Sequence, residues 1–190
     1  MNHSQFAIRP IHWACVLLFL VTGSLTAETS VSPQDFKQSC GGFVQNFYDW
    51  YVPKALKETG EPASNIAIRH KSSAFSPEIL RALKEDSQAQ AMASGEIVGM
   101  DFDPFLSGQD PCERYVVGNI TLRKDSYLVE VYGVCSGKKH GSPDVVPEVI
   151  FKDVRWLFVT FHYAIEKRSD DVNLLGVLKR LREDRQKLPK

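Results

Sequence analysis

Apolar residues recur at helical spacing in two stretches of the first half of the chain. The first begins at Ser32-Pro33, a pair typical of a helix start, and carries an aromatic-rich apolar face over residues 36–51. We interpret this face as core-facing rather than as a ligand-stacking platform. Pro53 predicts the end of this helix. A second start, Ser76-Pro77, begins another helix with Ile79, Leu80 and Leu83 on one face.

From Arg114 the apolar period changes from 3.6 to 2, which predicts strands. A tight turn at Lys124-Asp125 sets Leu122 opposite Tyr127 and Ile120 opposite Val129, and the same register carried onward sets Val116 opposite Gly133. The expected strands form two hairpins, over residues 115–123 with 127–135 and over residues 145–151 with 155–163.

The order of these elements predicts an α+β fold, in which N-terminal helices pack on a curved four-stranded antiparallel sheet. The last strand, residues 155–163, is apolar on both faces, so we expect it to lie centrally in the sheet with both sides covered. A C-terminal amphipathic helix is expected over residues 172–185. Helices on one face of such a sheet would leave a cone-like pocket.

The first 27 residues have the pattern of a cleaved signal peptide. Arg9 precedes an apolar run over residues 13–21, and Ala27 supplies a small residue at the expected cleavage point. Cys15 lies near the start of that run rather than after it, so we expect no lipid anchor. The expected product is a free periplasmic chain, residues 28–190, folded as one domain.

Charge and hydropathy exclude two classes of partner. Loss of Arg9 with the leader leaves 22 basic residues against 23 acidic ones, without a basic cluster, which argues against nucleic acid. No later apolar stretch approaches the length that spans a membrane. We therefore expect no membrane anchor after cleavage.

Three cysteines remain in the expected mature chain, and an oxidising compartment favours one disulfide and one free thiol. The strand register puts Cys112 and Cys135 on one side of the first hairpin, about one diagonal step apart. A bend at Pro111 brings such a pair within bonding reach. The hypothesis is a Cys112–Cys135 bond, with Cys40 as a buried free thiol.

The segment 100–112 separates the helical half from the strand half, and we expect it to form the rim of any site. Asp101, Asp103 and Asp110 are the candidates for chemistry, with Gln109 beside them. Three carboxylates can bind Ca²⁺, but the glycine and glutamate of an EF-hand loop are missing at their fixed offsets. Aspartate next to proline is ordinary in turns. We therefore expect turn structure, with partner contacts at the rim and no metal.

Enzymatic function has weaker support. His162 with Glu130 or Asp103 is a possible acid–base pair, but a single histidine near the end of an apolar strand is usually a core residue. Cys40 lies on the apolar helix face and lacks a polarising neighbour. The motifs of serine hydrolases, zinc proteases, P-loop proteins and dithiol oxidoreductases are missing. We expect no catalysis and no cofactor.

Several sequence blocks together resemble an uncharacterised family of bacterial exported and lipoprotein-type domains, itself similar to the nuclear-transport-factor-2-like (NTF2-like, cystatin-like) cone fold. The resemblance covers residues 36–163 and implies that fold, but no activity. Many relatives carry a lipid anchor, whose cysteine this chain lacks. The blocks are Phe43-Val44-Gln45-Asn46-Phe47-Tyr48-Asp49-Trp50-Tyr51, Ser76-Pro77-Glu78-Ile79-Leu80, Asp101-Phe102-Asp103-Pro104-Phe105, Gln109-Asp110-Pro111, Tyr115-Val116-Val117-Gly118 and Val145-Val146-Pro147-Glu148-Val149.

Two functions agree with these observations. The first is a non-catalytic protein-binding module of the bacterial envelope, such as an inhibitor or immunity protein whose aspartate-rich loop enters the basic active site of a toxin. The second is a carrier that holds a small ligand in the cone pocket. The residues expected to line that pocket are Trp50, Tyr132, Trp156 and His162.

Overall fold

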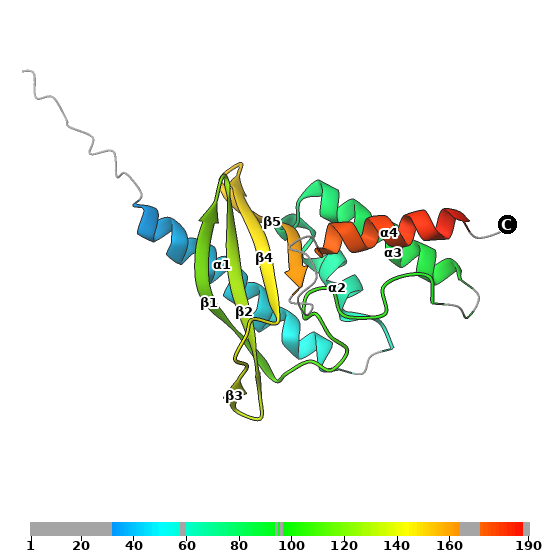
Figure 1. Cartoon of the computed structure of the whole chain (residues 1–190), viewed down its shortest axis with the longest axis horizontal. Coiled ribbons are helices and arrows are strands. Elements are labelled where there is room, and N and C mark those ends of the chain that lie inside the picture. The colour runs from blue at the N-terminus through cyan, green and yellow to red at the C-terminus, as the bar shows by residue number, and fades with distance from the viewer. Residues whose placement is uncertain (1–31, 58–59, 94, 96, 164–171, 188–190) are drawn as a thin grey trace, which may run out of the picture. The chain divides into compact units, whose positions relative to one another are not determined.

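The computed structural model describes residues 32–57, 60–93, 95, 97–163 and 172–187. Over these residues the chain forms four α-helices, one short 3-10 helix and a five-stranded antiparallel sheet (Figure 1). This arrangement confirms the α+β class and the packing of helices on an antiparallel sheet. The expected signal peptide, residues 1–27, lies outside the described residues.

The long first helix, α1 (Pro33–Ala55), begins as the sequence predicts. The Ser32 hydroxyl accepts a hydrogen bond from the Asp35 amide, and the Asp35 carboxylate accepts one from the Ser32 amide, which makes a capping box. The predicted end at Pro53 is wrong, because the helix continues to Ala55. A proline removes one backbone hydrogen bond, and here that loss falls in the last turn, where few helical residues follow.

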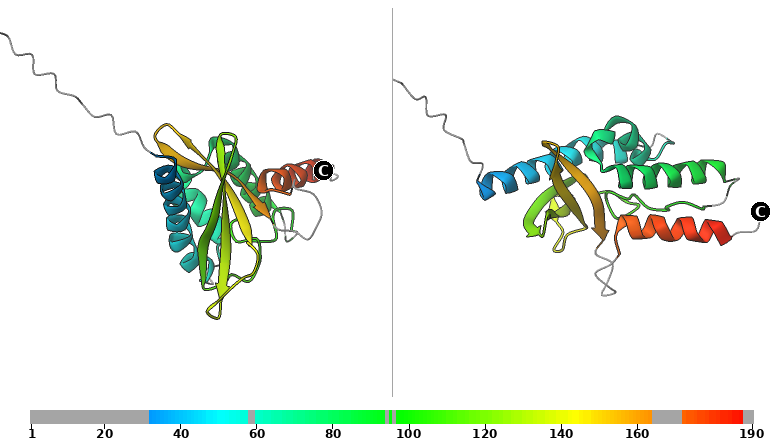
Figure 2. Two further views of the ribbon diagram at one scale, coloured as in Figure 1. Left: turned by 60° about the vertical axis from the view of Figure 1, so that its left-hand side comes forward. Right: turned by 90° about the horizontal axis from the view of Figure 1, so that it is seen from above.

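The other helices form a group beyond the sheet. Ser76 caps α3 through its hydroxyl, as predicted from the Ser-Pro pair, and α4 buries Leu174 and Leu178. Helices α3 and α4 lie side by side in two views of the molecule (Figure 2). The bounds are α2 (Ala63–His70), the 3-10 helix η1 (Ser72–Ala74), α3 (Pro77–Met92) and α4 (Leu174–Lys187).

The sheet has the strand order β1-β2-β4-β5, and a two-residue strand, β3, pairs with β2. The prediction of four strands missed β3, whose two residues are both lysines and give no alternating pattern. Each pairing is antiparallel. The bounds are β1 (Arg114–Arg123), β2 (Ser126–Cys135), β3 (Lys138–Lys139), β4 (Val145–Lys152) and β5 (Arg155–Tyr163).

Strand β5 lies at the end of the strand order, so its predicted central position is wrong. The predicted burial of this strand is nevertheless confirmed, since most of its residues are buried. An edge strand can be buried in this way because other segments cover its outer edge. The Ser76 amide donates to the Phe158 carbonyl at 2.8 Å, and the Tyr163 amide donates to the Val172 carbonyl at 3.2 Å. The chain entering α3 and α4 therefore protects this edge from further pairing.

The register of the first hairpin is confirmed next to its turn and wrong farther away. Leu122 lies opposite Tyr127 and Ile120 opposite Val129, but an irregularity between Val117 and Ile120 shifts the pairing by one residue. Val116 consequently lies opposite Tyr132 rather than Gly133. A β-bulge of this kind inserts an extra residue and redirects the side chains beyond it.

Aromatic rings from four parts of the chain form the core beneath the sheet. Phe47 of α1 contacts the rings of Phe75, Phe105 and Phe158 at centroid distances of 5.8, 5.4 and 4.9 Å. Edge-to-face pairs of this kind add to the gain from burying large apolar side chains. Because Phe105 belongs to the loop after α3, the core itself fixes the position of that loop.

Candidate functional site

The loop over residues 99–112, here called the acidic loop, is organised around Asp103. One carboxylate oxygen of Asp103 accepts from the amides of Phe105 and Leu106, at 2.9 and 3.2 Å, which makes a turn of the kind aspartate favours. The other oxygen accepts from the Tyr51 hydroxyl at 2.6 Å. Burial raises the pKa of Asp103, while these hydrogen bonds act in the opposite direction. Asp103 is therefore a structural residue of the loop.

Two more tyrosine hydroxyls hold the same turn. Tyr48 of α1 donates to the Phe105 carbonyl at 2.9 Å, and Tyr163 of β5 donates to the Pro104 carbonyl at 3.0 Å. Burial raises the pKa of both tyrosines well above the usual value, so both hydroxyls keep their protons. The turn at 103–105 is thus bonded to two separate elements of the scaffold.

An ion pair between α3 and α4 holds the start of the acidic loop. Arg185 of α4 donates to Asp86 of α3 at 2.6 Å and to the Val98 carbonyl at 2.9 Å. The second carboxylate oxygen of Asp86 accepts from the Met100 amide at 3.0 Å. Both side chains are largely buried, so removing either one would leave an uncompensated buried charge.

Between the acidic loop, α2 and α3 lies a cleft of about 560 Å³, here called the acidic cleft. Ile68, Leu83, Met100 and Phe102 make its lining partly apolar. Three of the four predicted rim residues, Asp101, Asp103 and Gln109, also line it, and Asp110 is exposed next to Gln109. The structure therefore brings the predicted rim to one cleft, and its contact with a partner stays a prediction.

The four residues expected in a cone pocket do not share one cavity. Trp156 donates to Ser39, near the start of α1, whereas Trp50 lies eleven residues, or about 16 Å, farther along the same helix. Tyr132 bonds to Glu130 of its own strand and lies beneath the Lys139 ammonium. The prediction that these four residues line one pocket is therefore wrong, because the tryptophans and Tyr132 pack against different neighbours along α1 and the sheet.

His162 bonds to a partner that the sequence did not suggest. Its Nε2 lies 2.9 Å from Glu148 on β4, and the other Glu148 oxygen accepts from the Ser126 hydroxyl at 2.6 Å. Partial burial raises the pKa of Glu148, but the hydrogen bonds from Ser126 and His162 outweigh it and hold that pKa below its usual value. All three residues border a second cleft of about 520 Å³. The proposed pairings of His162 with Glu130 or Asp103 are wrong.

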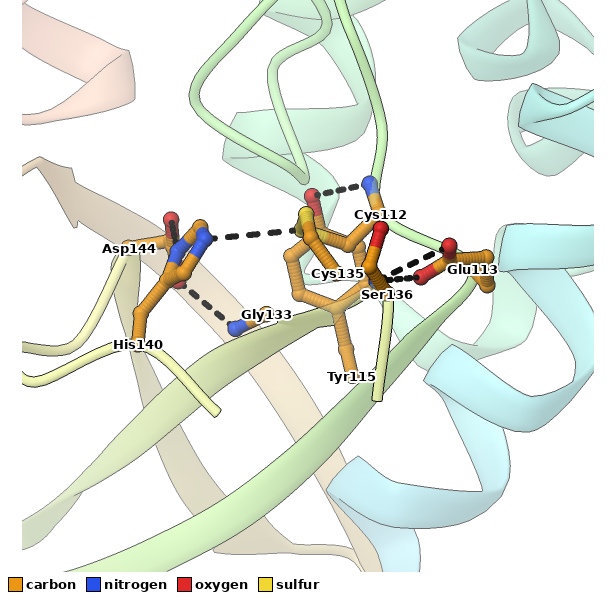
Figure 3. Close-up of a disulfide and its surroundings, with 8 residues drawn as sticks. All are labelled: Cys112, Glu113, Tyr115, Gly133, Cys135, Ser136, His140 and Asp144. Atoms are coloured by element: carbon orange, nitrogen blue, oxygen red, sulfur yellow. Dashed lines mark hydrogen bonds and ion pairs between the residues drawn. A yellow bond between two sulfur atoms is a disulfide. The ribbon is translucent and has the colours of Figure 1, made fainter. Parts of the chain in front are cut away.

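The predicted disulfide between Cys112 and Cys135 is confirmed, with a Cα–Cα distance of 4.7 Å (Figure 3). Cys40 is confirmed as a buried free thiol. Burial raises the pKa of the Cys40 thiol to about 12, so it is not a nucleophile at neutral pH. Within the described part of the chain, Cys112, Cys135 and His140 offer possible metal-ligand atoms within 4.8 Å of one another, but the bonded sulfurs present no thiolate.

Comparison with known proteins gives structural neighbours only. No protein-family model and no curated protein matches the chain. A protein of unknown function from Bacteroides thetaiotaomicron is 19% identical, with a TM-score of 0.47, over 67% of this chain and 92% of that one. The type VI effector–immunity complex Tae3–Tai3 from Ralstonia pickettii is similar over 68% of this chain and 100% of the matched chain, at 21% identity and a TM-score of 0.43.

The native form of the same Ralstonia pickettii complex gives 19% identity and a TM-score of 0.43, over 73% of this chain and 100% of that one. The described residues also include no helix long and apolar enough to cross a membrane.

Sequence reasoning missed two residues beside the disulfide. Neither His140 nor Asp144 was singled out in the sequence, yet their side chains pair at 2.8 Å and His140 lies against Cys112 (Figure 3). The available signal was their spacing of four residues directly after Cys135. The tyrosine hydroxyls that hold the acidic loop were missed for another reason: their rings were assigned to the core, and the bonding role of the hydroxyls was overlooked.

Proposed function

We propose that this chain is a non-catalytic protein-binding module that uses the acidic cleft to hold a basic segment of its partner. The observation that carries the proposal is the composition of the cleft. Its lining contains Asp86, Asp101 and Asp103 and, among the described residues, no lysine, arginine or histidine. An acidic cleft of this kind favours a cationic side chain through electrostatic complementarity.

The charges in the cleft are not equivalent. Asp86 is paired with Arg185, and the Asp103 carboxylate already accepts hydrogen bonds from Tyr51 and two backbone amides. Asp101 is exposed, and its carboxylate bonds to no other described residue. A partner's cation would therefore pair with Asp101, with Asp110 one short step along the rim.

The floor of the cleft adds an apolar contribution. Ile68 and Leu83 are buried beneath it, and Met100 and Phe102 are partly exposed in its wall. Removing apolar surface of this kind from water contributes roughly 25 cal/mol for each Å² before the entropy lost on association is subtracted. The preferred partner segment thus combines a lysine or arginine with an adjacent apolar side chain.

The rigidity of the rim supports a binding role. Hydrogen bonds from Tyr48, Tyr51 and Tyr163 hold the turn at 103–105, so little conformational freedom is lost when a partner docks. We assign the module to the bacterial envelope, where it acts as an inhibitor or immunity protein for an envelope-targeted toxin. The expected export signal and the disulfide support that location.

The proposal includes the NTF2-like relationship. Its support is the long helix α1 packed across an open antiparallel sheet. The domain would then be a variant in which the binding cleft lies beside the sheet, between α2, α3 and the acidic loop, rather than inside a cone.

The test is affinity capture with matched variants. The mature oxidised chain, an Asp101→Asn/Asp110→Asn variant and an Asp125→Asn control are immobilised and exposed to envelope and secreted fractions. Asp125 is an exposed acid in the β1–β2 turn, outside the acidic cleft. We expect one stoichiometric protein with the wild type and the control, and about tenfold less with the double variant. Equal capture by all three would reject the acidic cleft as the binding site.

A small-ligand carrier is the second candidate, favoured by the cleft volume. Pockets for small ligands span about 300–1,000 Å³, and the acidic cleft measures about 560 Å³. A carrier would release a small molecule on denaturation and capture no protein. In that case a Gln109→Ala or Ser87→Ala change in the lining would lower ligand retention, whereas Asp125→Asn would leave it unchanged.

A further inference from the structure

Three polar or reactive groups meet above one backbone position of β2, Gly133 (Figure 3). His140 Nε2 lies 3.8 Å from the Cys112 sulfur, and His140 Nδ1 lies 2.8 Å from one Asp144 oxygen. The other Asp144 oxygen accepts from the Gly133 amide at 2.6 Å. The carboxylate is thereby fixed in place and orients the imidazole toward the sulfur.

The cluster depends on the missing side chain of Gly133. A Cβ atom there would lie 2.7 Å from the Cys112 sulfur and 3.3 Å from both His140 Nδ1 and an Asp144 oxygen. A Cβ atom this close to the sulfur would clash with it, so the backbone or the disulfide would have to move. Glycine at this position therefore allows the disulfide, the imidazole and the carboxylate to assemble.

The two sulfurs of the bond have different surroundings. Cys112 is 4% exposed and has the imidazole within hydrogen-bonding distance. Cys135 is partly exposed at the end of β2. An external thiolate reaches Cys135 more readily, and the Cys112 sulfur is then the leaving group. A leaving thiolate beside an imidazole is stabilised, which speeds exchange.

We propose that the Cys112–Cys135 disulfide is a thiol–disulfide exchange site whose substrate is a dithiol. The thiolate that leaves at Cys112 is stabilised by His140, and Asp144 orients the His140 ring. This activity is independent of the acidic cleft. It assigns a chemical role to His140 and Asp144 that a purely structural disulfide would not need.

The first thiolate of the dithiol attacks the Cys135 sulfur, forms a mixed disulfide and releases Cys112 as a thiolate paired with protonated His140. The second thiolate of the dithiol then attacks the dithiol's first sulfur, which is bonded to Cys135 in the mixed disulfide, and releases Cys135, which takes a proton from solvent. Two electrons pass to the protein disulfide, and the dithiol leaves as a cyclic or intramolecular disulfide.

Other charged and titratable groups face the cluster and contribute to the pH dependence of exchange. Tyr115 of β1 accepts from the Cys112 amide at 3.4 Å, and Glu113 accepts from the Ser136 amide on the far side of the bond. Lys138 and Lys139 lie on β3. Asp144 faces the imidazole directly, with one carboxylate oxygen 2.8 Å from His140 Nδ1.

The experiment measures how fast dithiothreitol reduces the oxidised mature protein at pH 7, with site-resolved mass spectrometry of both cysteines. The variants are His140→Gln and Asp144→Asn, and Lys124→Gln is the control because Lys124 is exposed in the β1–β2 turn, at the other end of the hairpin from the disulfide. We expect His140→Gln to slow reduction about tenfold and Asp144→Asn to slow it less, with the control unchanged. Equal or faster reduction of His140→Gln would overturn the proposal.

A second readout follows the reduced protein. The alkylation rate of Cys112 with iodoacetamide is measured against pH for the wild type and for His140→Gln. In the wild type we expect half-maximal alkylation at a pH below the roughly 8.5 of an ordinary thiol, and a return toward that value in the variant. Identical profiles would overturn the assignment of His140, even if both proteins are folded and active in partner capture.

Discussion

The Tyr51 hydroxyl and the Asp103 carboxylate are joined by a 2.6 Å hydrogen bond that links α1 to the acidic loop. Asp103 also accepts from two amides of its own turn. One side chain therefore holds both the shape of the loop and its place on the scaffold. The aspartate-rich sequence is consequently not uniform: Asp103 builds the rim, whereas Asp101 and Asp110 are free to meet a partner.

This division of roles gives the first prediction. Asp103→Ala removes three hydrogen-bond acceptor contacts from a largely enclosed site and should lower the free energy of unfolding by about 2–3 kcal/mol. Asp103→Asn keeps one carbonyl oxygen for the two amides and an NH₂ group that can donate to Tyr51, so it should cost about 1 kcal/mol or less. Urea unfolding monitored by tryptophan fluorescence measures both. Equal losses would mean that the negative charge, rather than the bonding geometry, holds the loop.

The disulfide gives the second prediction. It closes a loop with a sequence separation of 23 residues, for which chain entropy predicts about 3.5 kcal/mol of stabilisation. Cys112→Ala/Cys135→Ala should lose about that amount in urea unfolding. Dithiothreitol should lower the stability of the wild type by a similar amount and leave the double variant unchanged. A loss below about 1 kcal/mol would contradict the assigned constraint.

A strained turn gives the third prediction. Asp153 and Val154 join β4 to β5 with φ values of 50° and 61°, and Val154 is 89% exposed. A β-branched residue with positive φ pays a steric cost that glycine avoids. Val154→Gly should therefore raise the free energy of unfolding by about 1 kcal/mol. Val146→Gly, within β4, is the control and should be destabilising; a destabilised Val154→Gly would show that the turn conformation is not the one described.

The Glu148–His162 contact gives the fourth prediction. Because hydrogen bonds hold the folded-state pKa of Glu148 below its usual value, its contribution to stability is complete above about pH 4.5 and is lost as the pH falls through the folded-state pKa. Glu148→Gln should thus be less stable than the wild type at pH 7 and approach it at pH 3. Thermal unfolding across that range measures the difference, with Asp125→Asn as control. A difference that does not depend on pH would argue against an ionised Glu148.

The helix starts and the disulfide could be predicted from the sequence because their determinants are local. Ser32-Pro33 and Ser76-Pro77 carry their capping groups within one turn, and the Cys112–Cys135 pairing follows from one hairpin. The error in register at Val116 came from the irregularity between Val117 and Ile120, where Gly118 closely approaches the Tyr132 ring. That approach is a tertiary contact and leaves no periodic signal.

The position of β5 and the cone pocket failed for a related reason. An edge strand whose outer edge is covered by the chain near Ser76 and Val172 has the same apolar pattern as a central strand. Likewise, the aromatic residues Trp50 and Trp156 are recognisable as large apolar side chains, but their sequence does not say whether they converge on one cavity. The acidic loop was located correctly because its composition interrupts both periodicities.

The most direct test of the central claim is site-specific photo-crosslinking at the acidic cleft. A photoreactive amino acid replaces Gln109 in one version of the mature chain and Lys124, in the distant β1–β2 turn, in another. We expect a partner crosslink from position 109 that Asp101→Asn/Asp110→Asn reduces, and none from position 124. A crosslink from position 124 alone would place the partner elsewhere and contradict the claim.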